Sequence, residues 1–408
     1  MLAALFAGLA SIPVGARGSE AGGVQWGRCV AAKNAPPRRL CGRLQRPLDP
    51  QDPKGASISI YFEYYRHTAP GRSFGALVAA EGGPGYPSTL SRDDYYALYA
   101  PFKDRNDLLL MDDRGTGQSG AVNCPALQTA VRLSVELIGD CGRSLGAAAP
   151  LYSTAYAADD LAAIIQALQL PAVDLYGDSY GTYFAQVFAL RHGALLRSVI
   201  LDGAYALNGS DYAWYPNYAA AMREKFNVAC ARWAPCARLP GDSISHILPA
   251  LQRLRAQPHA AAGHDADGLE RRFIADAAML ATVMFSAAPP YATLRETDAA
   301  ARSYQAGDEA PLLRLMAETL AATDSRDPAN DPTRYSAGLA AAVMCQDPPQ
   351  VFDLDLPPAQ RRGAFEQLMN ERARAHPLAY APFTLREYRG LPLDYSFIEQ
   401  CLLWPTPD

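Results

Sequence analysis

The order of apolar and polar positions predicts strands that alternate with helices in the first half of the chain. Five segments have the composition or the length of strands: residues 56–64, 76–80, 108–111, 173–176 and 198–201. One helical spacing of apolar residues lies behind Thr154, and a second follows the fourth segment and closes at Gly193. Alternating strands and helices form a mostly parallel sheet that is covered on both faces. We therefore predict an α/β core over residues 26–204.

The pattern changes after Ala204, where the chain becomes rich in alanine and is repeatedly broken by proline. The spacing predicts helices over residues 219–233, 244–255, 309–322 and 358–373, with no clear buried strand among them. We interpret residues 205–400 as a large helical cap, and residues 401–408 as the start of a return to the core. The Ala/Gly/Asp stretch around His259 and His264 is predicted to be a solvated loop.

Composition and charge exclude several classes of protein. The chain has 408 residues, of which 49% are hydrophobic and 19% charged, and these values argue against general disorder. The net charge of -5 is too small, and of the wrong sign, for a dedicated nucleic-acid binder. No apolar stretch reaches the roughly 18 residues that a membrane-spanning helix needs. The sequence leaves the oligomeric state open.

The first residues have the character of an export signal. Residues 1–16 are apolar and end in small residues, with a candidate cleavage point after Ala16. The Lys or Arg that normally precedes such a segment is missing, and a buried or frayed N-terminal segment is the alternative.

The cysteines support the same location. No two of the eight form a C-x-x-C pair, which disfavours a zinc site or a thioredoxin-like site. They fall into the near-neighbour pairs 29 with 41, 124 with 141 and 230 with 236, which leaves 345 with 401. An even number with short loops fits disulfides in an oxidising compartment, although sequence does not fix the pairing and eight buried thiols are the alternative. We expect a secreted or periplasmic protein.

The pentapeptide Gly177–Gly181 has the form G-x-S-x-G and lies between a predicted strand and a predicted helix. The two glycines allow a tight, strained turn that exposes Ser179 as a nucleophile. The helix N-terminus behind it offers backbone N–H groups to a developing oxyanion. An ordinary strand–turn–helix with an accidental serine is the alternative.

Two glycine-rich segments follow other predicted strands. In the first, Glu81–Tyr86, a Gly-Gly turn lets backbone N–H groups approach a ligand closely, and a plain turn is the alternative. The second, Asp112–Gly120, contains G-x-G-x-x-G, the pattern of a dinucleotide-binding turn. A loop that supports the active site fits this segment better. Two acids and an arginine lie beside the turn, and no helix pattern follows it.

Together the segments Glu81–Gly85, Asp112–Ser119 and Gly177–Gly181 resemble the proline iminopeptidase-like α/β-hydrolases, most closely the secreted tripeptidyl-aminopeptidase branch. The segments Leu201–Gly203 and Cys401–Pro405 also match that branch, and the resemblance covers roughly residues 26–405. Members are serine exopeptidases that remove residues or short peptides from a free N-terminus. The resemblance implies that Ser179 is the nucleophile and that the backbone N–H groups of Gly83 and Tyr180 form the oxyanion hole, with Gly82 as the second choice for Gly83.

The sequence departs from this family at two places. The usual histidine before Gly-Gly-Pro-Gly is Glu81, which either binds a substrate ammonium or is a paired structural acid. The last two core strands of the family, with the triad acid and the triad histidine, have no counterpart before Asp408. Asp202 is the best internal candidate for the acid. The histidines are His67, His192, His246, His259, His264 and His376, and none has a sequence position that marks it as the base.

These observations predict an α/β-hydrolase core with a helical cap that lacks its last strands. The predicted function is a secreted serine exopeptidase that acts on peptides with a free N-terminus through an acyl-enzyme, inactive or weak as this chain, without a metal or an organic cofactor. A carboxylesterase of the same fold is one alternative. A catalytically silent fragment or hydrolase-like binding protein is the other.

Overall fold

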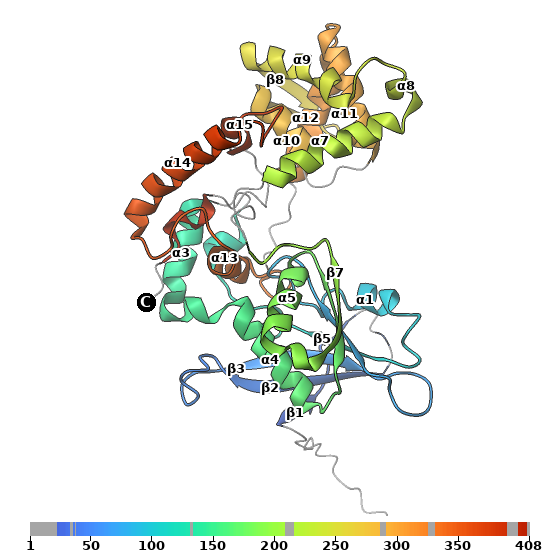
Figure 1. Ribbon diagram of the computed structural model, residues 1–408, viewed down its shortest axis with the longest axis vertical. Helices are drawn as coiled ribbons and strands as arrows, with labels where there is room; N and C mark the ends of the chain where they lie inside the picture. Colours follow the sequence, from blue (N-terminus) through green and yellow to red (C-terminus); the bar gives the residue numbers. More distant parts are fainter. Residues whose placement is uncertain are drawn as a thin grey trace, which may run out of the picture.

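The computed structural model describes residues 23–32, 36, 38–130, 134–208, 216–285, 291–324, 331–389 and 399–405. They form a sheet flanked by helices, with a second, mostly helical unit beside it (Figure 1). The predicted signal, residues 1–16, lies outside the described residues. In the described part of the chain, no helix combines the length and the apolar character needed to cross a membrane.

Seven strands form the central sheet, in the spatial order β1-β2-β3-β5-β4-β6-β7. Their bounds are Val24–Gly27 (β1), Arg39–Pro47 (β2), Ser57–Tyr65 (β3), Ala76–Ala80 (β4), Asp107–Met111 (β5), Val173–Asp178 (β6) and Leu196–Asp202 (β7). The first three strands form an antiparallel meander whose third strand pairs antiparallel with β5, and β5, β4, β6 and β7 run parallel. The sheet is therefore α/β in type, as the five apolar segments predict.

Strands β1 and β2 are absent from the sequence prediction. Strand β2 carries Arg39, Arg43 and Arg46 and ends in Pro47, so that it lacks the apolar run that marks a buried strand. It is held instead by nine paired positions along β3, which is itself almost completely buried.

Helices cover the two faces of the sheet to different extents. On one face, α4 (Thr154–Ala167) and α5 (Tyr180–His192) bury Ile164, Phe184 and Phe188 in the main core. On the other face, α1 (Arg92–Leu98) covers a smaller core that contains Tyr95 and the alternate residues of β4 and β5. Between β5 and α4 lie α2 (Pro125–Gln128), α3 (Val135–Leu145) and the 3-10 turn η1 (Gly146–Leu151), and η2 (Gly193–Leu195) joins α5 to β7.

Strand β7 forms one edge of the sheet and is exposed along most of its length. Among the described strands its only partner is β6. Three consecutive apolar side chains, Val199, Ile200 and Leu201, are 36%, 49% and 39% exposed. A parallel strand is normally buried on both faces, so this edge is unusually apolar for the amount of water it meets.

The chain leaves the core after β7 and builds the cap (Figure 1). The cap contains the helices α7 (Pro216–Ala231), α8 (Ala234–Ala237), α9 (Ser243–Ala256), α10 (Ala277–Phe285), α11 (Tyr291–Gln305) and α12 (Ala310–Asp324). It also contains an antiparallel hairpin of β8 (His259–His264) and β9 (Glu270–Ala275). The predicted solvated loop at His259 and His264 is thus wrong: both lie on β8, whose alanines carry little strand propensity.

The chain returns to the core earlier than residue 401. Helix α13 (Ala337–Gln346), inside the predicted cap of residues 205–400, packs on α2 and α3 of the core. The Ser336 hydroxyl donates to the Val122 carbonyl at 2.8 Å, and the Tyr183 hydroxyl to the Asp347 carbonyl at 2.8 Å. The remaining elements are α14 (Pro358–Ala375), α15 (Leu385–Arg389) and η3 (Gln400–Leu403), and η3 also packs on α3. The cap proper therefore ends before α13.

All four near-neighbour cysteine pairs form disulfides, Cys29–Cys41, Cys124–Cys141, Cys230–Cys236 and Cys345–Cys401. The first two lie in the core and the third within the cap. The fourth joins α13 to η3. The predicted disulfides are confirmed.

Candidate active site

Ser179 occupies a sharp turn between β6 and α5. Its backbone angles are φ 49° and ψ −121°, a conformation that a residue with a Cβ rarely adopts. The flanking glycines are required by close approach. A Cβ on Gly177 would lie 2.1 Å from the Gly181 carbonyl oxygen, and a Cβ on Gly181 would lie 2.1 Å from the Ala80 carbonyl oxygen. The pentapeptide therefore forms the strained elbow that its sequence predicts.

Hydrogen bonds hold this turn against its neighbours. The Ser179 N–H donates to the Asp202 carbonyl at 2.9 Å, which ties the elbow to the end of β7. The Thr182 hydroxyl donates to the Ser179 carbonyl at 2.7 Å and accepts from the Tyr205 N–H at 3.0 Å. The strain at Ser179 is thus sustained by the strands and the helix around it.

The glycine-rich loop after β4 runs directly beside Ser179. A Cβ on Gly82 would lie 3.0 Å from the Ser179 Cβ, so a side chain here would press on Ser179. Gly83 has φ 118°, again a glycine conformation. The Gly82 N–H donates to Glu81 Oε1 at 3.0 Å and is therefore engaged by a carboxylate. Gly82 and Gly83 are the two predicted donors to the oxyanion. Of these, Gly82 donates its N–H to the Glu81 carboxylate and Gly83 does not.

Tyr180 begins α5, so that its N–H has no partner within the helix and lies where the positive end of the helix dipole is strongest. Its side chain is buried away from the turn, and its hydroxyl lies 2.7 Å from the Thr154 hydroxyl. The residue thus contributes its backbone to the site and its ring to the core.

Three carboxyl groups lie near the elbow, at the ends of three neighbouring strands. Glu81 follows β4, Asp178 ends β6 and Asp202 ends β7. The Tyr95 hydroxyl donates to Asp178 Oδ1 at 2.8 Å, and the Tyr176 hydroxyl donates to Asp202 Oδ2 at 3.0 Å. Among the described residues, no Lys or Arg forms an ion pair with any of the three. We call Glu81, Asp178 and Asp202 the acidic rim.

Burial and nearby negative charge raise the pKa values of Glu81 and Asp178 above those of ordinary carboxyl groups. Burial raises the pKa of Glu81, and the Asp178 charge raises it further, against the Ser91 hydroxyl and the Gly82 N–H, which lower it. Burial also raises the pKa of Asp178, as does Asp202, while the Tyr95 hydrogen bond lowers it. The Glu81 Oε2 atom is buried, and no donor among the described residues meets the distance and angle of a hydrogen bond to it. A cation bound beside these carboxylates would stabilise their ionised forms.

The Asp112–Gly120 loop supports the site and has no free phosphate-binding turn. The Asp112 carboxylate accepts the Gln118 N–H at 2.9 Å and the Thr89 N–H at 3.2 Å. A Cβ on Gly117 would lie 2.3 Å from Asp112 Oδ2, so this carboxylate occupies the hollow of the glycine turn. Buried Arg114 makes two hydrogen bonds to Asp160, at 2.8 and 2.9 Å, which fixes the loop on α4.

Two of the six histidines, His67 and His192, belong to the core, and neither reaches Ser179. His67 Nδ1 lies 2.8 Å from Asp107 Oδ1. Asp107 begins β5, so this pair lies at the opposite end of the parallel strands from the elbow. His192 ends α5, at the other end of that helix from Ser179, and its Nε2 lies 2.7 Å from Asp159 Oδ1.

The other four histidines lie in the second half of the chain. His246 is on α9, His259 and His264 are on β8, and His376 follows α14. In the described part of the chain no histidine hydrogen-bonds to Ser179 Oγ, and Asp202 pairs with Tyr176. Among the described residues, the structure thus brings Ser179 together with Gly83 and Tyr180, and it places no histidine within hydrogen-bonding distance of Ser179 Oγ.

Comparison with known proteins supports this geometry. A family model described as the alpha/beta hydrolase fold matches residues 75–361. The chain belongs to the α/β-hydrolase family. The matched segment includes the loop after β4, the elbow and most of the cap of this α/β hydrolase.

Individual relatives of this α/β hydrolase are distant. Tripeptidyl aminopeptidase of Streptomyces lividans is 27% identical over 226 residues, which cover 49% of this chain and 41% of the relative. Serine protease Hip1 of Mycobacterium tuberculosis is 27% identical over 241 residues, which cover 52% of this chain and 46% of the relative. A solved thermophilic esterase from Thermogutta terrifontis is 16% identical with a TM-score of 0.29, and the match covers 78% of this chain and 76% of that one. The chain spans half or less of the length of the curated relatives it matches.

The sequence singles out Ser179, Gly83, Tyr180 and Glu81 as candidates, and it does not predict two arrangements that the structure shows. The acidic rim was signalled only by the fact that each of three parallel strands ends in an acid. A second arrangement, in the cap, brings Cys230 and Cys236 next to His246 and Asp298. Its members lie up to 68 residues apart in sequence, and no short motif marks them.

Proposed function

We propose that this α/β hydrolase is a serine exopeptidase that acts at the free N-terminus of peptides. The observation that carries the proposal is the elbow: Ser179 stands in a strained turn beside the Gly82–Gly83 loop, near an acidic rim that has no Lys or Arg partner among the described residues. The relatives named as a tripeptidyl aminopeptidase and a serine protease agree with peptide substrates.

In the proposed reaction the Ser179 oxygen attacks the carbonyl carbon of the scissile bond. The carbonyl oxygen becomes an oxyanion, which the N–H groups of Gly83 and Tyr180 stabilise. Collapse of the tetrahedral intermediate releases the amine and leaves an acyl-enzyme, which water then hydrolyses. Both steps need a base to take and return a proton, and removing the base from such a site costs several orders of magnitude in rate.

We propose that the base and its acid partner belong to a segment that pairs with the outer edge of β7. This edge exposes Val199, Ile200 and Leu201, as expected of a strand that lies inside a larger sheet. The elbow is tied to the end of β7 by the Ser179–Asp202 hydrogen bond. A strand added at this edge would therefore end beside the nucleophile.

The acidic rim supports recognition of a substrate ammonium. Glu81 adjoins the oxyanion loop, and its unpartnered Oε2 is a site where a cation would find an acceptor. A buried carboxylate that binds an α-ammonium discriminates strongly against an acylated N-terminus, because the charge is then left unpaired. The elbow alone does not distinguish amides from esters, so this preference separates a peptidase from a carboxylesterase.

The test supplies the missing base chemically. The 408-residue chain is mixed with a tripeptide p-nitrophenyl ester, either with a free amine or N-acetylated, at increasing concentrations of imidazole. We expect p-nitrophenol release to rise with imidazole in the wild-type chain above the rate in Ser179→Ala, which measures direct hydrolysis by imidazole. We expect the free amine to react at least about tenfold faster than its acetylated twin, and Glu81→Gln to reduce this ratio.

Each other outcome changes the assignment. Equal rates for both esters, with dependence on Ser179, would favour a carboxylesterase. Equal rates in the wild-type chain and Ser179→Ala would favour the catalytically silent protein. A fluorophosphonate that labels Ser179 rapidly without imidazole would show that a base is already in place.

A further inference from the structure

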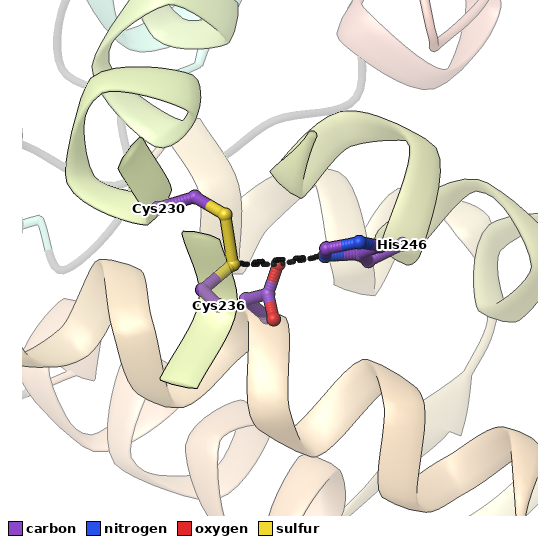
Figure 2. Close-up of side chains that lie close together, drawn as sticks. Cys230, Cys236 and His246 are labelled. Carbon is purple, nitrogen blue, oxygen red and sulfur yellow. Dashed lines mark hydrogen bonds and ion pairs between the residues drawn. A yellow bond between two sulfur atoms is a disulfide. The ribbon is translucent and has the colours of Figure 1, made fainter. Parts of the chain in front are cut away.

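The cap contains a cluster of four potential metal ligands, far in sequence from the elbow. Cys230 lies in the last turn of α7, Cys236 on α8, His246 on α9 and Asp298 on α11. One ligand atom from each lies within 4.8 Å of all the others. Figure 2 shows the Cys230–Cys236 disulfide with the ring of His246 directed at it. The cysteines and Asp298 are at most 5% exposed.

Two of the three distances among Cys236 Sγ, His246 Nδ1 and Asp298 Oδ2 are close to those of a tetrahedral zinc site. Cys236 Sγ lies 3.7 Å from His246 Nδ1 and 3.4 Å from Asp298 Oδ2, and Nδ1 lies 2.9 Å from Oδ2. With zinc–ligand bonds of about 2.0–2.3 Å at tetrahedral angles, such pairs are separated by about 3.3–3.6 Å. To bind zinc, the Nδ1–Oδ2 pair would separate by about 0.4 Å, and the two sulfurs, bonded to each other, are also too close. In a zinc site they would be about 3.8 Å apart.

The groups behind these ligands are also those of a metal site. His246 Nε2 faces the Pro240 carbonyl at 3.0 Å, which leaves Nδ1 as the ligating atom. Arg302 donates to Asp298 Oδ1 at 2.9 Å, which leaves Oδ2 facing the cluster. Two thiolates, one carboxylate and a dication sum to one negative charge, which the Arg302 guanidinium balances. Second-shell contacts of this kind orient metal ligands and fix the histidine tautomer.

The frame of the cluster is held without the disulfide. Asn227 on α7 donates to Asp242 Oδ2 at 3.0 Å and accepts the Ile244 N–H at 3.2 Å, at the start of α9. Asp242 and Ser245 form a capping box that begins this helix. These bonds keep α7 and α9 together when the S–S bond is broken.

We propose that Cys230, Cys236, His246 and Asp298 bind one zinc-class divalent cation when the Cys230–Cys236 disulfide is reduced. A dithiol reductant breaks the S–S bond by supplying two electrons, its own two sulfurs join as a disulfide, and its two protons pass to Cys230 and Cys236. Zinc then displaces these two protons and binds both thiolates with Nδ1 and Oδ2. The cap thus has an oxidised form closed by the disulfide and a reduced form closed by the metal.

The test is a metal titration of the full 408-residue chain, either oxidised or reduced without oxygen by a water-soluble phosphine. The phosphine supplies the two electrons and takes its oxygen from water, whose protons go to the thiolates. Titration of the reduced chain with Co²⁺ alone should give one tetrahedral site per chain with thiolate-to-cobalt absorption, and Zn²⁺ should displace it. We expect the oxidised chain to bind at least about 100-fold more weakly, because it lacks thiolate ligands.

Variants assign the ligands. The double variant Cys230→Ser/Cys236→Ser should lose the cobalt absorption, and His246→Gln or Asp298→Asn should weaken binding at least about tenfold. The matched controls are Cys29→Ser/Cys41→Ser, which removes another disulfide, and His192→Gln, which removes another Asp-paired histidine. Both should bind as the wild-type chain does. Equal binding by Cys230→Ser/Cys236→Ser, or by the oxidised chain, would overturn the proposal.

A second measurement needs no variant and covers the case in which a variant does not fold. The reduced wild-type chain is alkylated with and without Zn²⁺, and the modified cysteines are mapped by mass spectrometry. We expect Zn²⁺ to slow alkylation of Cys230 and Cys236 but not that of Cys29 and Cys41. Unchanged alkylation of Cys230 and Cys236 in Zn²⁺ would overturn the proposal.

Discussion

Ser179 and the two glycines around it form a unit in which backbone strain and close packing depend on each other. The serine adopts φ 49° only because Gly177 and Gly181 allow the strand, the turn and the loop after β4 to pack within van der Waals distance. The same closeness places the Gly82–Gly83 loop beside the nucleophile. Adding a methyl group to either glycine would therefore disturb the position of Ser179, although the serine itself is unchanged.

This closeness predicts a large effect of Gly181→Ala. The new Cβ would lie 2.1 Å from the Ala80 carbonyl oxygen, and this backbone atom cannot rotate away. We expect a loss of roughly 3 kcal/mol or more in the free energy of unfolding, measured by urea denaturation. Gly193→Ala is the matched control, because a Cβ there meets nothing within 4 Å and its φ is −53°. Equal effects of the two substitutions would contradict this account of the elbow.

The acidic rim predicts a pH-dependent gain in stability from Glu81→Gln. Because burial raises the pKa of Glu81, the folded chain keeps this proton at pH values where the unfolded chain has released it. Unfolding therefore becomes easier as pH rises from about 4, the pKa of an unfolded glutamate, through the raised pKa. Glu81→Gln removes this penalty, and we expect it to stabilise the chain at pH 7 and to have less effect at pH 4.

Asp174→Asn, at the other end of β6, is the control with the opposite sign. Hydrogen bonds from Arg197 lower the pKa of Asp174, so its ionised form stabilises the fold above about pH 4. This substitution should destabilise the chain at pH 7 and have less effect at acidic pH. Thermal melts of the three chains at both pH values measure the difference, and a destabilising Glu81→Gln would show that this carboxylate is a structural acid.

At the scale of elements, apolar runs predicted strands of the parallel sheet, including the exposed edge strand β7, and strands without such runs escaped detection. Strands β3 to β7 were found because they carry consecutive β-branched, aromatic or aliphatic residues. Strand β2 was missed because pairing with β3, and not its own composition, defines it, and β8 because it is made of alanine, glycine and histidine. Likewise Ser179 has a local motif, whereas the acidic rim and the Cys/His/Asp cluster exist only once separate elements are packed.

The exposed edge of β7 predicts self-association of the chain. An apolar strand with unpaired backbone groups is a template for pairing with another chain. We expect light scattering by the 408-residue chain to rise with concentration, and Ile200→Lys to suppress it without loss of stability, because Ile200 is already 49% exposed. Leu190→Lys is the control, since Leu190 is 78% exposed but lies on α5. Suppression by both substitutions alike would point to a general charge effect.

At the scale of the whole molecule, two disulfides close very different lengths of chain. Cys345–Cys401 spans 56 residues and joins α13 to η3, which both pack on α3 of the core. Cys230–Cys236 spans 6 residues within the cap. Buried Arg361 reinforces the longer closure, because its guanidinium donates to the carbonyls of Leu354 and Trp404. The segment after the cap is therefore attached to the core at both of its ends.

Loop length predicts how much each disulfide contributes to stability. Chain-entropy arguments give about 4 kcal/mol for a loop of this longer size and about 2 kcal/mol for the shorter one. We expect Cys345→Ala/Cys401→Ala to lower the free energy of unfolding by about 2 kcal/mol more than Cys230→Ala/Cys236→Ala, in urea denaturation monitored by far-UV circular dichroism. The two pairs are similarly buried, so the loss of side-chain packing is nearly matched between the variants. If the cap variant proves the less stable, its disulfide stabilises the folded cap directly, and chain entropy is then the smaller contribution.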